Sequence, residues 1–120
     1  MVYPLESKLV LDAAFAVHKE LGPGLLEFPY HNALYYELVH AGCVVAYNAP
    51  FAVRYRGEVV GEYNADLLVN SLVVLEVKSV AALGNAHTAQ LLNYLRLSGC
   101  RLGFLLNFQP SRLEFKRLVL

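Results

Sequence analysis

Cysteine is scarce in this chain. Only Cys43 and Cys100 occur among the 120 residues, far apart and each without a neighbouring thiol. This usage argues against a disulfide framework, a zinc ribbon and an iron–sulfur site, and it makes a reducing compartment the default. No two of the four histidines lie at H-x-x-x-H spacing, so a zinc site is not expected either.

Long apolar runs are also missing. No run reaches the roughly 18 residues that a membrane span needs. Glu6, Lys8 and Asp12 interrupt the first apolar residues, unlike the pattern of a secretion signal. The sequence therefore predicts a cytoplasmic protein with no membrane partner. With 57% hydrophobic residues in 120, it also predicts one domain over residues 1–120 around a single core.

Charge of either sign is sparse. Charged residues make up 17% of the chain, and ten basic residues balance ten acidic ones, so no whole-molecule field attracts polyanions. The last part is nevertheless basic, because Glu114 is its one acid beside Arg96, Arg101, Arg112, Lys116 and Arg117. We interpret this part as a solvated strand and turn. The alternative is a short edge that faces phosphate.

The spacing of apolar residues changes along the chain between the helical period and the strand period of two. Short turns join the first three strands, which predicts that they pair antiparallel, and the fourth is apolar enough to be central in a sheet. The predicted elements are helices over 5–21 and about 29–41, strands over 44–55, 59–69 and 72–80, a helix over 84–98, and strands over 102–108 and 113–120.

The start of the second helix is set by Pro29 in this interpretation. Proline is acceptable in a first helical turn, but it disfavours helical backbone at the residue before it, Phe28. We therefore expect Glu27 in the turn before the helix. Tyr30, the residue after Pro29, is expected to pack against the core more readily than to stack on a base.

Charges interrupt two of the apolar strands. In "SLVVLEVKSV", residues 71–80, side chains alternate between two faces, so Glu76 and Lys78 emerge on one face. Asp66 interrupts the preceding strand in "YNADLLV". Asp66 and Glu76 are about equally far from the Asn70-Ser71 turn, so a hairpin would bring the two carboxylates close together.

Two carboxylates in a partly buried site repel each other, and a hard divalent cation resolves that conflict. Magnesium prefers oxygen ligands and usually keeps several waters, so two carboxylates and a backbone carbonyl would form an incomplete cage for it. A lysine two residues further on could orient or deprotonate the attacking water, which suits phosphodiester hydrolysis. The alternative is a solvated Glu76–Lys78 pair that contributes at most about 1 kcal/mol.

Several stretches of the chain, taken in order, resemble a known family. Asp66 followed by Glu76-Val77-Lys78 on the next strand resembles the PD-(D/E)XK nuclease superfamily, although the first motif reads Asn-Ala-Asp, without proline. Gly24, Glu27 and Tyr30 have the spacing of the GxxExxY family, a small branch of that superfamily. The similarity runs from "AFAVHKELGPGLLE" through "ADLLV", "LEVKSV" and "AQLLNYL" to "LGFLLNF".

This resemblance implies an α/β (α+β) fold with a restriction-endonuclease-like αβββαβ core, in which helices flank a central mixed sheet. It implies that Asp66, Glu76 and the carbonyl of Val77 bind Mg²⁺ or Mn²⁺. It makes Lys78 the catalytic lysine and Glu27 an additional acidic residue. It also places Gln90 and Tyr94, which share one helical face, beside the active site.

The implied activity is metal-dependent hydrolysis of nucleic acid, with DNA favoured over RNA. The neutral net charge and small size leave a second interpretation, a catalytically silent binding or assembly module with a nuclease fold. The apolar composition also permits a homodimer or a protein partner. From the residues alone, Gln90 and Tyr94 remain equally well explained as a surface amide and a core aromatic.

Overall fold

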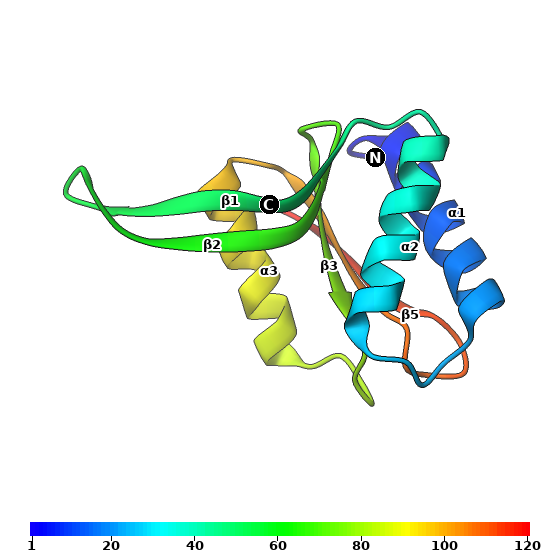
Figure 1. The fold of residues 1–120 in the computed structure, drawn as a ribbon. Coiled ribbons are helices and arrows are strands. Elements are labelled where there is room, and N and C mark those ends of the chain that lie inside the picture. Colours follow the sequence, from blue (N-terminus) through cyan, green and yellow to red (C-terminus); the bar gives the residue numbers. More distant parts are fainter.

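Three helices and five strands make up the computed structural model, which describes residues 1–120. They follow one another in the predicted order (Figure 1). Their bounds are α1 Pro4–Leu21, α2 Glu27–His40, β1 Val45–Tyr55, β2 Glu58–Val69, β3 Val73–Lys78, α3 Asn85–Ser98, β4 Leu102–Asn107 and β5 Glu114–Val119.

The five strands form one mixed sheet in the order β1-β2-β3-β4-β5. β3 and β4 are parallel, and all other neighbouring pairs are antiparallel. Antiparallel neighbours need only short turns, whereas the parallel pair needs a crossover, which α3 supplies. The central position predicted for residues 102–108 and the edge position predicted for 113–120 are both confirmed. The predicted α+β class with a restriction-endonuclease-like arrangement is confirmed as well.

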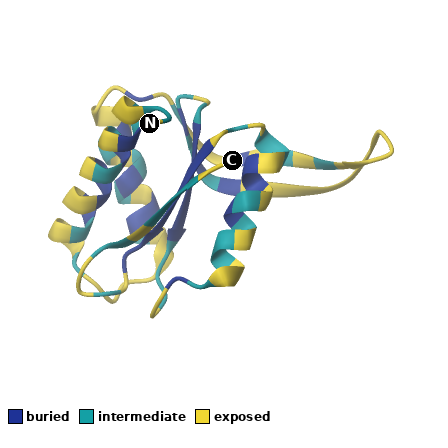
Figure 2. Cartoon of the chain, turned by 180° about the vertical axis from the view of Figure 1, so that it is seen from behind, coloured by how far each residue is buried: buried dark blue, intermediate teal, exposed yellow.

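Helices cover both faces of the sheet (Figure 1). One core contains Val73, Leu75 and Val77 of β3 and the inner sides of α1 and α2. A second, smaller core contains Val74 and the inner side of α3. Buried residues accordingly follow the sheet and the sheet-facing sides of the helices (Figure 2). This alternation confirms the predicted faces of β3 and leaves Glu76 and Lys78 on the α3 side.

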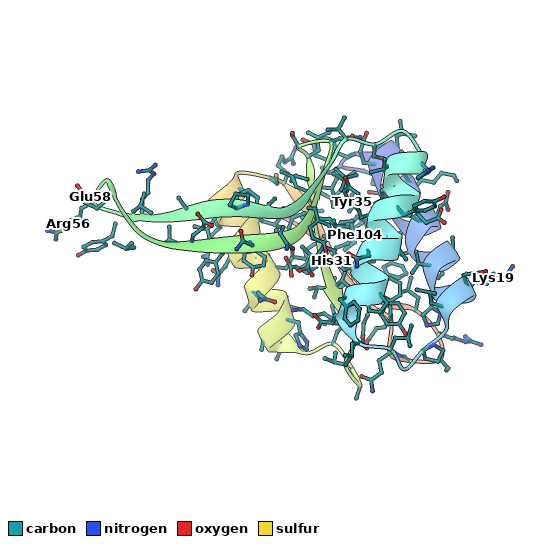
Figure 3. All side chains as sticks on the ribbon, viewed as in Figure 1. Lys19, His31, Tyr35, Arg56, Glu58 and Phe104 are labelled. Atoms are coloured by element: carbon teal, nitrogen blue, oxygen red, sulfur yellow. The ribbon has the colours of Figure 1, made fainter.

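The far part of the β1–β2 hairpin projects beyond the rest of the molecule as a two-stranded arm (Figure 1). Every residue from Glu58 to Asn64 is exposed. Arg56 and Gly57 form the tip, with φ of 49° and 82°, as a two-residue turn that follows the twist of the strands requires. Figure 3 shows Arg56 and Glu58 at the end of the arm, far from both cores.

Helix α2 begins two residues earlier than predicted. Glu27 is its first residue, so the expectation that Glu27 lies in the preceding turn is wrong. Pro29 is tolerated at the third helical position, because the first amides of a helix have no partner within it. Tyr30 is fully buried and stacks on Phe108 with ring centroids 4.7 Å apart, which confirms its packing role.

Two of the basic residues near the C-terminus, Lys116 and Arg117, do not share a face of β5. Arg117 donates to the carbonyl of Val2 at 2.6 Å and to the hydroxyl of Ser7 at 3.4 Å, so it joins β5 to the start of α1. Lys116, the preceding residue, points to the opposite face of the strand. The alternative of a phosphate-facing edge is therefore not supported for this pair.

None of the three helices is both long and apolar enough to cross a membrane.

Candidate active site

Asp66 lies where β2 separates from β3. The pairing of these strands ends at Leu67↔Leu75, one residue before Asp66 would face Glu76. At that point side chains bond the backbone: the Val77 N–H donates to Asp66 Oδ2 at 2.7 Å, and the Asp66 N–H donates to Glu76 Oε1 at 3.1 Å. The two carboxylates therefore meet at the separation of the strands, as their distances from the turn predict.

The pairing of β2 with β1 is interrupted at the same residue. Tyr47 pairs with Leu67 and Ala49 with Ala65, but Asn48, which lies opposite Asp66, pairs with nothing. Asn48 has a φ of 51°, in the left-handed region that few non-glycine residues adopt. No pattern in the sequence indicates this interruption.

Glu76 is the more buried of the two acids, with 3% of its surface exposed. Burial raises the pKa of its carboxyl to about 8, and the nearby charge of Asp66 contributes in the same direction. The Asp66 N–H and the Lys78 ammonium oppose the rise. Without a cation, Glu76 therefore holds its proton at neutral pH, because a second negative charge beside Asp66 in this buried site is unfavourable.

Lys78 points towards helix α3. Its Nζ donates to Gln90 Oε1 at 2.8 Å, and Gln90 Nε2 donates to the hydroxyl oxygen of Tyr94 at 3.3 Å. The helical spacing of four residues brings the amide and the phenol together on one side of α3. Burial and the charge of Glu76 raise the pKa of Tyr94, which keeps this phenol neutral beside the acids.

The backbone of Val77 is directed to the same place. Residues of a strand point their N–H and C=O to the same side, and the Val77 N–H bonds Asp66 across the separation. The carbonyl of Val77 is therefore directed towards Asp66 as well. Two carboxylates and a carbonyl form an oxygen donor set that suits a hard divalent cation with its remaining waters.

Glu27 stands apart from this pair. It is exposed in the first turn of α2 and lines a pocket with Ser79 and Gln109, beyond the end of β3. Ser79 Oγ donates to the Leu25 carbonyl at 2.6 Å and holds this segment against β3. No three His, Cys, Asp or Glu side chains gather as a metal cluster, so Glu27 does not join Asp66 and Glu76 in one.

Two polar residues that the sequence did not single out support the site. His31, one turn after Glu27 on α2, places its Nε2 2.9 Å from the carbonyl oxygen of Asp66. Fully buried Asn107 bonds both the N–H and the C=O of Val80 and fixes the loop after Lys78. The one available signal for His31 was its spacing of four from Glu27. No sequence signal marked Asn107, because an asparagine at the end of an apolar strand is equally well explained as an amide that caps the strand.

A comparison against protein families shows the family of the chain. A model of the PD-(D/E)XK nuclease superfamily matches residues 5–118. The chain belongs to this superfamily. Nucleases of this superfamily generally use divalent metals.

A solved structure has a similar fold. The structure titled "Crystal structure of SSO0001" matches with a TM-score of 0.63 at 22% sequence identity, over 78% of this chain and 50% of that one. The chain thus spans about half of that protein, and at this identity the likeness concerns the fold. A search of curated proteins found no match.

Proposed function

We propose that this protein is a Mg²⁺- or Mn²⁺-dependent nuclease that hydrolyses phosphodiester bonds, with DNA as the preferred substrate. The observation that carries the proposal is the meeting of Asp66 and Glu76 where β2 leaves β3. The Asp66 N–H donates to Glu76 Oε1 there, and the Val77 N–H donates to Asp66 Oδ2. Buried acids this close repel each other, and a dication between them removes the repulsion.

Asp66, Glu76 and the Val77 carbonyl would hold the cation. When bound, such a cation supplies positive charge to the phosphate and lowers the pKa of water. The chain's own residues would place the reacting groups. Lys78 emerges on the face of β3 that carries Glu76, so its ammonium would orient the attacking water or stabilise the charge that develops on the phosphate.

Gln90 and Tyr94 would position the lysine. The hydrogen bond from Lys78 Nζ to Gln90 Oε1 holds the ammonium beside Glu76, and Tyr94 fixes the amide in turn. A lysine restrained in this way loses less side-chain freedom when substrate binds. Glu27 would remain an additional acidic residue, in a pocket beyond the end of β3 that Asp66 and Glu76 do not line.

We further propose that the chain belongs to the GxxExxY branch. In "GPGLLEFPY" the Tyr30 hydroxyl donates to the Gly22 carbonyl at 2.5 Å and accepts from the Leu25 N–H at 3.1 Å. Gly24, at φ 95°, supplies the left-handed backbone that closes this loop. Gly24 and Tyr30 thus fix the start of α2 and the placement of Glu27. This gives a physical reason for the spacing of the three residues, and it supports the assignment to the GxxExxY branch.

Cleavage of labelled oligonucleotides tests the activity. Duplex DNA, single-stranded DNA and RNA of one sequence would be incubated with Mg²⁺, Mn²⁺ or EDTA. We expect metal-dependent cleavage of DNA that falls about 100-fold or more in Lys78→Ala, because the group placed for proton transfer or charge stabilisation is lost. Lys8→Ala is the matched control, since Lys8 is exposed on α1 and pairs with Asp12 at 2.6 Å.

Equal residual cleavage by the wild type and by Lys78→Ala would exclude the proposed nuclease activity. Faster cleavage of RNA than of DNA would reverse the substrate preference.

The silent binding module remains the second candidate, because no third acid joins Asp66 and Glu76. Calorimetry separates the two. A module of this kind would bind no Mn²⁺, and added Mn²⁺ would raise the melting temperature of the wild type no more than that of Asp66→Ala, because Asp66 is then not a metal ligand.

A further inference from the structure

His31 is a buried polar residue of α2 with 9% of its surface exposed. Figure 3 shows it on the side of α2 that faces the sheet. Its ring stacks on Tyr47 of β1, with centroids 4.2 Å apart and planes within 5° of parallel. The Tyr47 hydroxyl donates to Asn32 Oδ1 at 2.7 Å, which holds the tyrosine in place. The His31 side chain is therefore held in one position between α2 and β1.

The direction of the Asp66 N–H and C=O explains the role of the His31 side chain. The Asn70 N–H bonds the Val44 carbonyl at 2.7 Å, so Asn70 directs its backbone towards β1. Successive strand residues direct their N–H and C=O alternately towards one neighbouring strand and the other. Asp66, four residues before Asn70, would therefore direct its N–H and C=O towards Asn48 of β1. That pair is the one that the ladder omits.

Two side chains replace the missing partner. Glu76 Oε1 accepts from the Asp66 N–H at 3.1 Å, and His31 Nε2 lies 2.9 Å from the Asp66 carbonyl oxygen. A carbonyl only accepts, so Nε2 carries the proton and donates. Without His31 this part-buried carbonyl would lack a partner, at the point where neither neighbouring strand pairs with Asp66.

We propose that His31 is a positioning residue that holds the Asp66 carboxylate in its metal-binding orientation. This inference rests on the proposed function. Asp66 bonds His31 through its carbonyl and the Val77 N–H through Oδ2 at 2.7 Å, so the imidazole and β3 fix opposite ends of one residue. If the imidazole bond is lost, the peptide can rotate and move the carboxylate away from Glu76.

Two substitutions separate the donor from the ring. His31→Phe keeps an aromatic ring for Tyr47 but has no donor, whereas His31→Gln keeps an N–H donor without the ring. We expect the Kd for Mn²⁺, measured by calorimetry, to rise about tenfold or more in His31→Phe and to stay within about threefold of wild type in His31→Gln, as for other residues that orient a ligand. His40→Ala is the matched control, because His40 lies on the same helix, exposed, and bonds only the Tyr36 carbonyl.

Amide hydrogen exchange gives a readout that needs no metal. In His31→Phe the Val77 amide should exchange about tenfold faster relative to the Phe104 and Leu106 amides of β4, because its acceptor Asp66 is released. In His31→Gln the ratio should remain that of the wild type. A purely structural defect would instead accelerate all three amides together. If His31→Phe does not fold, His31→Met provides the same contrast with His31→Gln.

The outcomes can be told apart. An unchanged Val77 exchange ratio in His31→Phe would overturn the inference, and so would an equal loss in His31→Gln, since the donor would then be irrelevant. If wild-type protein binds no Mn²⁺, the proposed function fails, while the exchange ratio still decides whether His31 holds Asp66.

Discussion

Replacing Glu76 by Gln tests the electrostatic basis of the site directly. Glutamine resembles the protonated carboxyl: its oxygen can still accept from the Asp66 N–H, and its amide can donate to the Asp66 carboxylate. In the folded protein without metal, burial and Asp66 raise the pKa of Glu76 from 4.5 to about 8. The unfolded chain has the ordinary pKa, so at neutral pH it releases a proton that the folded protein retains.

The sign and size of the effect follow from proton linkage. A carboxyl whose pKa is raised on folding causes no loss of stability below its unfolded pKa, and it causes a growing loss as the pH rises towards the folded pKa. With values of 4.5 and about 8, the loss amounts to about 1 kcal/mol at pH 5 and about 3 kcal/mol at pH 7. Glu76→Gln removes the titration, so its gain in stability should be about 2 kcal/mol larger at pH 7 than at pH 5.

Urea unfolding in EDTA at the two pH values measures this difference. Glu62→Gln is the matched control, because Glu62 is exposed on the same hairpin and its removal should change the free energy of unfolding by less than about 0.5 kcal/mol at either pH. The reasoning is refuted if Glu76→Gln gives the same change at pH 5 and pH 7. A loss of stability at pH 7 refutes it as well.

Two further predictions concern the metal and the loop after β3. Because Glu76 holds its proton up to a pH of about 8, Mn²⁺ must displace that proton, so the Kd for Mn²⁺ should fall about tenfold per pH unit between pH 6 and 8. Calorimetry in buffers of different ionisation enthalpy should count one proton released for each Mn²⁺ bound. A pH-independent Kd would contradict this prediction. Asn107→Ala should destabilise the protein by about 2–4 kcal/mol in urea unfolding, because it leaves the Val80 N–H and C=O without partners. Asn93→Ala, at an exposed site on α3, should change stability by less than about 0.5 kcal/mol, and a similar small effect of Asn107→Ala would show that the loop is held by other contacts.

The sequence by itself determined the elements and the facing of the charges. Alternation along a strand placed Glu76 and Lys78 on one side of β3, and the short turn at Asn70 placed Asp66 opposite Glu76. Both depend on residues within one hairpin. Backbone geometry and turn length therefore fix them without any knowledge of the remaining chain.

Only the tertiary structure decided how the site is held. The pairing around Asp66 stops on both sides, and the replacement bond comes from His31, 35 residues away on α2. The start of α2 at Glu27 and its distance from the two acids likewise depend on how this helix packs on the sheet. Contacts between distant elements follow from the packing of the whole core, and no local pattern encodes them.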